Sequence, residues 1–192
     1  MILLPQTALL SQTSKAWSQC IGREGPIADL VIEGCGAIIE AGQGTPAQLG
    51  LAFNNRGVAY RLKGEYDHAL DDYNEAIRLN PTSASHYNNR GIIFRIKQEY
   101  DRAIEDYDRA IFLRRDYPAA FYNRAIAYSR KGDKRRALLD FDVVLQFNAK
   151  NALALYARAQ VKLEEGDTTG ANADIAAATA INPNVADEYK KF

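Results

Sequence analysis

The chain has 192 residues, of which 47 % are hydrophobic and 25 % charged, so it is long enough to bury one good core and is not disordered by composition. Lys and Arg together number 24, as do Asp and Glu. The resulting formal net charge of zero argues against a polybasic surface for nucleic acid or anionic lipid.

The apolar stretch near the start, ILLPQTALL, is interrupted by Pro5 and Gln6 and is far too short to span a bilayer. No Lys or Arg precedes Lys15, so the stretch lacks the charged start of a signal peptide. It could still be the end of a hydrophobic signal region whose beginning is missing, and this alternative stays open.

Residues 27–42, IADLVIEGCGAIIEAG, carry apolar side chains at helical spacing and predict a helix that packs on the element after it. That next element begins at TPAQ, residues 45–48, where Thr45 suits the N-cap and Pro46 the first helical position. Residues 1–49 are therefore predicted to form an N-terminal arm with a capping helix.

From residue 50 the sequence repeats with a period of 34 residues. Windows that begin at residues 50, 84, 118 and 152 share large residues at positions 4, 11 and 24 and small ones at positions 8 and 20, with departures in the last window. Such a pattern suits two antiparallel helices that cross closely. Gly64, Gly132 and Gly166 at position 15 mark the turn between them, whereas Gln98 breaks this turn pattern.

Each window thus predicts a helical hairpin, and its aromatic, Gly, Ala and Pro positions resemble the tetratricopeptide repeat (TPR) family, in particular bacterial TPR-domain proteins. The resemblance covers four units, residues 50–83, 84–117, 118–151 and 152–185. It implies an all-α fold, a right-handed α-solenoid of four hairpins that follows the N-terminal capping helix. Residues 186–192 are expected to form a short C-terminal cap, since the end of a solenoid needs a polar face.

Position 7 is Arg and position 23 is Asp in all four windows. Because position 7 lies on the first helix and position 23 on the second, we predict a structural ladder of ion pairs between helices. The alternative is an arginine row exposed to an acidic ligand. The predicted members are Arg56, Arg90, Arg124, Arg158, Asp72, Asp106, Asp140 and Asp174.

The only two cysteines, Cys20 and Cys35, both lie in the N-terminal arm. They suffice for one disulfide, while two buried reduced thiols are the alternative. The TPR resemblance favours the disulfide, because exported bacterial TPR proteins often carry a Trp- and Cys-bearing segment such as AWSQC before a second Cys. For the same reason we favour an extracytoplasmic, periplasmic location over a cytoplasmic one.

Signatures of chemistry are missing from the sequence. His68 and His86 have no Cys or His partner at metal spacing, and there is no Walker loop, nucleophile elbow or HExxH motif. The repeated NNRG has a single Gly inside a helical stretch, which does not suit a phosphate loop. We therefore predict no enzyme, no cofactor and no metal site.

The resemblance implies a concave surface lined by the first helix of each hairpin, to which positions 2, 5, 9, 12 and 13 point. We predict that this groove binds a protein or peptide segment, with no nucleic acid partner and no membrane insertion. Its predicted residues are Asn54, Val58, Arg61, Asn88, Asn89, Ile92, Arg95, Tyr122, Ile126 and Tyr156. The alternative is a homo-oligomeric scaffold that associates through the groove or the N-terminal arm.

A carboxylate clamp for a chaperone tail is the best-known ligand site of the family. Of the five positions that build it, only Asn89 matches. The other four are occupied here by Asn54, Val58, Ala119 and Asn123. A clamp of this kind is therefore not expected.

Overall fold

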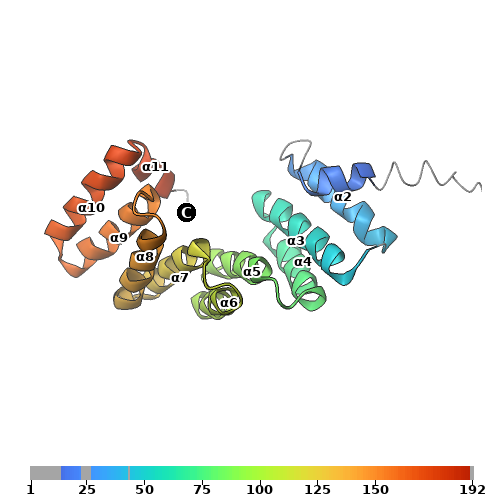
Figure 1. Ribbon diagram of the computed structural model, residues 1–192, viewed down its shortest axis with the longest axis horizontal. Coiled ribbons are helices and arrows are strands. Elements are labelled where there is room, and N and C mark those ends of the chain that lie inside the picture. Colours follow the sequence, from blue (N-terminus) through green and yellow to red (C-terminus); the bar gives the residue numbers. More distant parts are fainter. Residues whose placement is uncertain (1–13, 23–26, 43, 191–192) are drawn as a thin grey trace, which may run out of the picture. The chain divides into compact units, whose positions relative to one another are not determined.

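The computed structural model describes residues 14–22, 27–42 and 44–190 of the chain. These residues form helices joined by short turns, and no strand occurs among them (Figure 1). The apolar stretch considered as a signal region, residues 2–10, lies outside the described residues, and so do the last two residues of the predicted C-terminal cap. The fold is all-α, as the sequence predicted.

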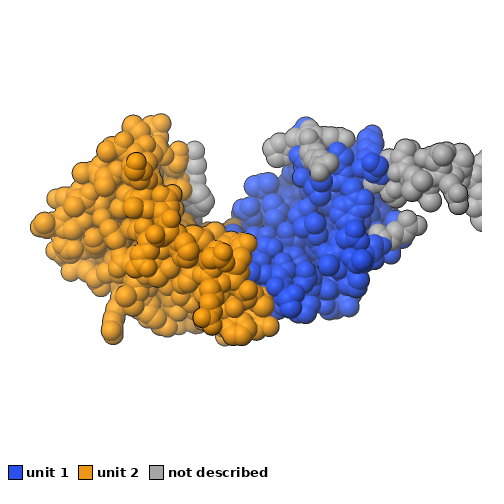
Figure 2. Space-filling view, viewed as in Figure 1, with its two compact units in different colours: residues 1–93 blue, residues 94–192 orange. Residues whose placement is uncertain are grey.

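Two compact units make up the chain, residues 1–93 and residues 94–192 (Figure 2). The division falls within the helix α5, Ala84–Ile96. Each unit is described by itself below.

Unit 1 begins with a short helix over residues 14–20, followed by α2 (Ala28–Ala41), α3 (Pro46–Leu62) and α4 (Tyr66–Leu79). Helix α2 packs on α3, and α3 packs on α4 as the first repeat hairpin. The predicted capping helix at residues 27–42 is therefore present, and it covers the face of α3.

The start of α3 has the predicted cap. The Thr45 hydroxyl accepts a hydrogen bond from the Gln48 backbone N–H at 3.2 Å, and the Gln48 side chain accepts one from the Thr45 backbone N–H at 2.8 Å. Pro46 occupies the first turn, where its missing N–H costs nothing. This reciprocal pair satisfies two backbone donors that the helix itself leaves open.

Unit 2 contains α6 (Tyr100–Leu113), α7 (Pro118–Lys131), α8 (Lys134–Phe147), α9 (Ala152–Glu165), α10 (Thr168–Ile181) and α11 (Val185–Tyr189). Helices α7 and α8 form one antiparallel hairpin and α9 and α10 the next, with α6 against α7 and α8 against α9. The short helix α11 returns onto α9, and its Val185 is buried beside Leu155 and Ala178.

The large and small residues that recur at fixed positions of the repeats form the core. Position 24 supplies Tyr73, Tyr107 and Phe141, and these three side chains are completely buried. Gly57 shows why position 8 is small: a Cβ added there would lie 2.8 Å from the Tyr73 ring. The rings at position 24 therefore fill the space that small residues at position 8 leave where the two helices cross.

The turn inside each hairpin has a left-handed residue at position 15. Gly64, Gly132 and Gly166 have φ of 80°, 88° and 86°. Gln98 takes the same conformation, with φ of 62°, although its side chain departs from the glycine pattern. The backbone turn is thus regular where the sequence pattern is not.

Candidate functional site

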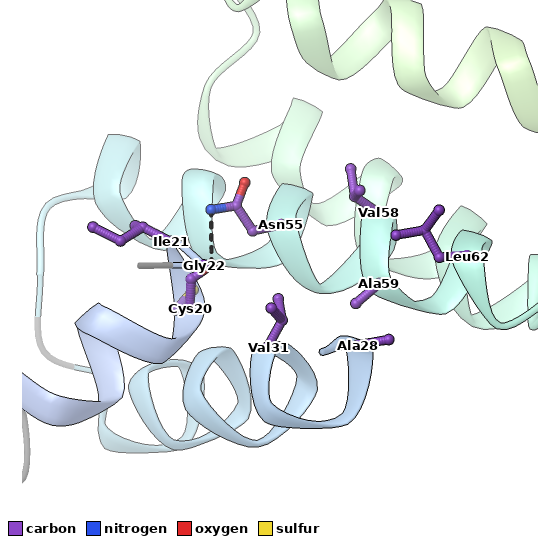
Figure 3. A pocket seen from close by; sticks show the side chains of 9 residues that line it. All are labelled: Cys20, Ile21, Gly22, Ala28, Val31, Asn55, Val58, Ala59 and Leu62. Atoms are coloured by element: carbon purple, nitrogen blue, oxygen red, sulfur yellow. Dashed lines mark hydrogen bonds between the residues drawn. The ribbon is translucent and has the colours of Figure 1, made fainter. Parts of the chain in front are cut away.

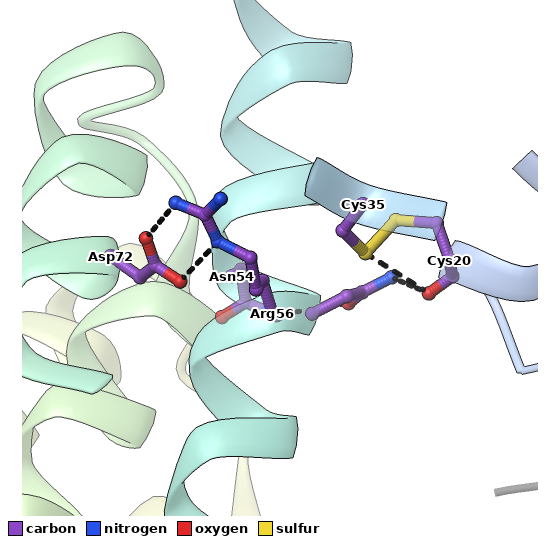
Figure 4. Close-up of a disulfide and its surroundings, with 6 residues drawn as sticks. Cys20, Cys35, Asn54, Arg56 and Asp72 are labelled. Atoms are coloured by element: carbon purple, nitrogen blue, oxygen red, sulfur yellow. Dashed lines mark hydrogen bonds and ion pairs between the residues drawn. A yellow bond between two sulfur atoms is a disulfide. The ribbon is translucent and has the colours of Figure 1, made fainter. Parts of the chain in front are cut away.

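Three of the predicted Arg–Asp pairs are bidentate. In unit 1 the Arg56 Nε and Nη2 donate to Asp72 at 2.9 and 2.7 Å (Figure 4). In unit 2 Arg124 pairs with Asp140 and Arg158 with Asp174 in the same way, at distances of 2.6 to 2.8 Å. Each pair joins the first helix of a hairpin to the second.

A second set of partners, which the sequence analysis missed, lies at position 25 of the preceding hairpin. The Nη1 atoms of Arg90, Arg124 and Arg158 donate to Asn74, Asp108 and Asp142 at 2.8, 2.6 and 2.7 Å. The signal was present in the sequence, because position 25 is polar in three repeats and becomes Ala176 in the fourth, which no further arginine follows. The pairing of Arg90 with Asp106 remains a prediction.

Burial distinguishes the two sets of carboxylates. Asp72, Asp140 and Asp174 are about 5 % exposed, whereas the Asp108 and Asp142 side chains are about half exposed. Burial raises the pKa of the Asp140 carboxyl, and the Arg124 guanidinium acts against this. Burial acts on Asp174 as well, but hydrogen bonds from Arg158 and Lys162 outweigh it and lower its pKa. These arginines are already engaged by carboxylates, which is the structural role predicted.

A disulfide joins Cys20 to Cys35 and so links the helix at 14–20 to α2 (Figure 4). Both cysteines are at most 1 % exposed and form a core cluster with Ile38 and Ala52, against which Trp17 packs. The Cys20 carbonyl accepts a hydrogen bond from the Asn55 side chain at 3.2 Å. The two helices that the disulfide links are thereby attached to α3.

The asparagines at position 6 repeat this attachment. Asn55 donates to Cys20 across 35 residues, and Asn89 donates to the Asn54 side chain across the same separation, at 2.9 Å. The helix at 14–20 and α2 together are called the N-terminal hairpin. This hairpin is therefore joined to the first repeat by the same kind of asparagine hydrogen bond that joins the first repeat to the start of α5. Asn89 has a structural partner here.

For two residues of unit 1, Asn54 and Asn88, the prediction of an accessible position in the groove is wrong. Asn54 and Asn88 are only 7 % and 5 % exposed, and each donates a hydrogen bond to the adjacent asparagine at position 6. Val58, Arg61 and Ile92 are half-buried and keep some accessible surface.

Val58 lines an open pocket of about 200 Å³ between α2, α3 and the turn after the first helix (Figure 3). Most of the lining is apolar. The one amide in it, Asn55, already donates to the Cys20 carbonyl. The lining residues are Cys20, Ile21, Gly22, Ala28, Val31, Asn55, Val58, Ala59 and Leu62.

Apolar side chains continue from this pocket to the surface. Ile21, which lines it, is 41 % exposed, and Leu62 is 62 % exposed. Beside Leu62, the Lys63 ammonium donates to Asp29 of α2 at 2.8 Å. The arrangement is an apolar hollow next to an ion pair, which suits an apolar side chain of a partner.

Unit 2 holds the remaining predicted groove residues. Ile126 is only 4 % exposed, so the prediction that its side chain lines an accessible groove is wrong. Arg95, Tyr122 and Tyr156 are half-buried. The Tyr156 ring lies 5.4 Å from the Tyr189 ring of α11, between ring centres.

Within the described part of the chain, no cluster of three or more His, Cys, Asp or Glu side chains could hold a metal. His86 is buried with its Nδ1 3.1 Å from the Ala76 carbonyl, and the exposed His68 lies beside Glu65. None of the helices in these residues combines the length and apolar character needed to cross a membrane.

Consecutive antiparallel hairpins, spaced by 34 residues and joined by arginine ladders, define an α-helical repeat protein. Sequence profiles of the tetratricopeptide repeat match residues 50–83 and 72–105, and a TPR repeat profile matches residues 93–132. The chain therefore contains tetratricopeptide repeats, matched over residues 50–132.

Solved structures show the same fold. MamA superposes with a TM-score of 0.73 at 19 % identity, covering 92 % of this chain and 94 % of that one. YrrB, described as a TPR protein with an unusual peptide-binding site, gives 0.71 at 18 %, covering 94 % and 91 %. The second TPR domain of human RPAP3, in complex with an HSP70 peptide, gives 0.59 at 27 %, covering 61 % and 98 %. No protein of curated function matches the sequence.

Proposed function

We propose that this chain is a non-catalytic module that binds a peptide or protein segment through first helices of its repeats, in unit 1 at α3. The observation that carries the proposal is the apolar pocket at Cys20, which Val58 and Leu62 of α3 line together with Val31 of α2. The family and its solved relatives are generally interaction modules, and the RPAP3 domain was solved with a peptide bound.

The chemistry of the residues that line the pocket indicates which ligand groups it would accept. Its side chains are aliphatic, and its one amide is used within the fold, so a polar ligand group would lose water there without gaining a hydrogen bond. An aliphatic side chain of the bound segment would instead remove apolar surface from water on both partners. We therefore expect bound segments to share an aliphatic anchor.

Selection from a displayed random-peptide library tests this. We expect the wild type to enrich peptides with an aliphatic anchor, and Val58→Asp to lose them because it places a charge in the pocket. Leu139→Asp is the matched control, since it adds the same charge at a side chain of unit 2 that is 57 % exposed. Circular dichroism must show equal helicity. Absence of enrichment, or enrichment that survives Val58→Asp, would overturn the proposal.

A second candidate function is a homo-oligomeric scaffold. Large apolar side chains are exposed on the second helices of unit 2, Phe112 at 68 % and Phe147 at 50 %, which favours self-association. Sedimentation across a range of concentrations distinguishes the two functions. Only a scaffold would exceed 21.3 kDa without a partner and return to that mass in a Phe112→Ser, Phe147→Ser variant.

The buried disulfide supports an extracytoplasmic location, because disulfides persist in oxidising compartments. Alkylation of the native protein under non-reducing conditions, followed by mass spectrometry, tests it. Two alkylated thiols at Cys20 and Cys35 would count against this location.

A further inference from the structure

Cys20 lines the apolar pocket at Val58 and also forms one half of the disulfide. Its side chain is bonded to Cys35 of α2, and its carbonyl accepts the hydrogen bond from Asn55 of α3 (Figure 3). The walls of the pocket are α2, α3 and residues 20–22, where the helix at 14–20 ends and turns. One residue therefore joins all three walls.

The wall formed by residues 20–22 depends on the disulfide more than the other two walls do. Helices α2 and α3 pack directly on each other. The helix at 14–20 has only about two turns, and a helix this short is not stable without tertiary contacts. Among the described residues, cutting the disulfide leaves the Asn55 hydrogen bond and the packing of Ala16 and Trp17 to hold this wall.

Reduction of the disulfide and occupation of the pocket make opposite demands on this wall. Cys20 and Cys35 are at most 1 % exposed, so a thiolate reaches their sulfurs only after the helix at 14–20 has moved away from α2. A side chain seated in the pocket would contact Cys20 and Ile21 and so hold the same wall in place. Binding and reduction are therefore mutually exclusive.

We propose that the Cys20–Cys35 disulfide assembles this pocket, so that the oxidised protein binds an aliphatic anchor and a dithiol reductant releases it. The inference rests on the proposed peptide-binding function and adds its regulation. One thiolate of the dithiol attacks a cysteine sulfur, which breaks the Cys20–Cys35 bond and forms a mixed disulfide. The second thiolate displaces that cysteine. The two cysteines gain two electrons and two protons in all, and the dithiol leaves as a disulfide.

Affinity measurements on the oxidised and reduced protein test the proposal. Peptides enriched by the oxidised protein should bind the reduced protein at least about tenfold more weakly, because only the fraction of molecules with an assembled pocket can bind. A Cys20→Ala, Cys35→Ala variant should bind as weakly without any reductant. The same variant is the control for the reductant: the chain has no other cysteine, so adding a dithiol must leave the affinity of this variant unchanged.

Methyl resonances separate the loss of one wall from general unfolding. Reduction should shift the methyl signals of Ile21 and Val31, which line the pocket. The signals of Val144 and Val161, which are 1 % and 2 % exposed in unit 2, should stay where they are. If reduction shifts all four sets, the disulfide supports the whole chain and does not control the pocket, which overturns the inference.

The coupling must also appear in the reverse direction, because linkage between two equilibria is reciprocal. In a buffer of oxidised and reduced dithiothreitol, a saturating peptide should shift the equilibrium towards the disulfide by the factor by which oxidation tightens binding. Alkylation of the free thiols followed by mass spectrometry measures the reduced fraction. A peptide that binds both forms equally, or leaves this equilibrium unchanged, overturns the inference while the peptide-binding function stands.

N-acetyl-leucinamide provides a probe that does not depend on the selection. At millimolar concentration it should shift the methyl signals of Val31 and Val58 in the oxidised protein but not in the reduced protein or the double alanine variant. If no peptide is enriched yet the probe behaves in this way, redox control of the pocket stands and the peptide function fails. If no peptide is enriched and the probe shifts these signals in both states or in neither, the inference is overturned.

Discussion

Arg124 contacts two carboxylates whose exposure to solvent differs. The ion pair with the buried carboxylate stabilises the fold, whereas the ion pair with the exposed one contributes little to stability. The Asp140 side chain is 8 % exposed, and the Asp108 side chain is 51 % exposed. A buried charge that loses its partner is not rescued by water, whereas an exposed one is. The repetition of Arg and Asp in the sequence does not reveal which aspartate has which role.

The first prediction compares these two carboxylates. Asp140→Ala should lower the free energy of unfolding by about 3–5 kcal/mol, because it leaves the partly buried Arg124 guanidinium without its bidentate partner. Asp108→Ala, which removes the exposed partner of the same arginine, should cost less than about 1 kcal/mol. Urea denaturation measures both. Equal losses would show that burial does not control the ladder.

The second prediction concerns the stability of the fold at acidic pH. The pKa of Asp174 is lowered from its ordinary value of 3.8, so the folded state holds this proton less tightly than the unfolded chain. Its contribution to stability is present above pH ~4 and is lost as the pH falls further, through the folded pKa. The stability difference between wild type and Asp174→Asn should therefore be largest near pH ~6 and shrink towards pH ~3.

Urea denaturation at both pH values measures this difference. Asp142→Asn is the control, because Asp142 contacts the same Arg158 from a half-exposed position and should show a small difference throughout. A difference for Asp174→Asn that stays constant with pH would contradict the assignment.

At the scale of the element, each hairpin depends on one residue in the left-handed conformation between its helices. Gly64, Gly132 and Gly166 adopt it without steric cost, whereas Gln98 adopts it with a Cβ that crowds the backbone. The second hairpin therefore has a local backbone cost at this turn that the other three do not have.

The third prediction is that Gln98→Gly stabilises the protein by about 1 kcal/mol, since it removes the strain of a left-handed non-glycine residue. The greater freedom of glycine in the unfolded chain offsets part of this gain. The reverse change, Gly132→Gln, should destabilise by a similar amount. Thermal and urea unfolding measure both, and a destabilised Gln98→Gly variant would contradict the turn conformation described here.

At the scale of the whole molecule, repeat proteins are stabilised by contacts between neighbouring elements, so a local change weakens the nearest part most. The disulfide closes a loop at the N-terminal end, where the only tryptophan, Trp17, packs against its core cluster. Tryptophan fluorescence therefore reports this hairpin, while circular dichroism reports all the helices.

The fourth prediction follows from that contrast. Reduction should destabilise the N-terminal hairpin by about 3 kcal/mol, the loop-closure entropy of a 15-residue loop. The Trp17 transition should move to lower denaturant by more than the circular dichroism transition does. A Cys20→Ser, Cys35→Ser variant should reproduce the reduced protein without reductant. Coincident transitions under both conditions would show instead that the chain unfolds as one cooperative block.

The sequence by itself determined the helical hairpins, their period and the core positions, because spacings such as that from Gly57 to Tyr73 act within one hairpin and recur in each. It also indicated the cap at Thr45 and the Arg–Asp pairing across a hairpin, both of which depend on short separations. Glycine at position 15 predicted three of the turns. The remaining turn was not evident from the sequence, because its position 15 is Gln98.

Only the tertiary structure decided which side chains are covered and which meet across repeats. Asn54, Asn88 and Ile126 have groove positions in the sequence but are buried, because exposure depends on the neighbouring helix and not on the residue's own. The contact of Asn55 with Cys20 and the pocket at Val58 likewise join elements distant in sequence. Periodicity places a side chain on a helix face, whereas packing between helices determines what that face touches.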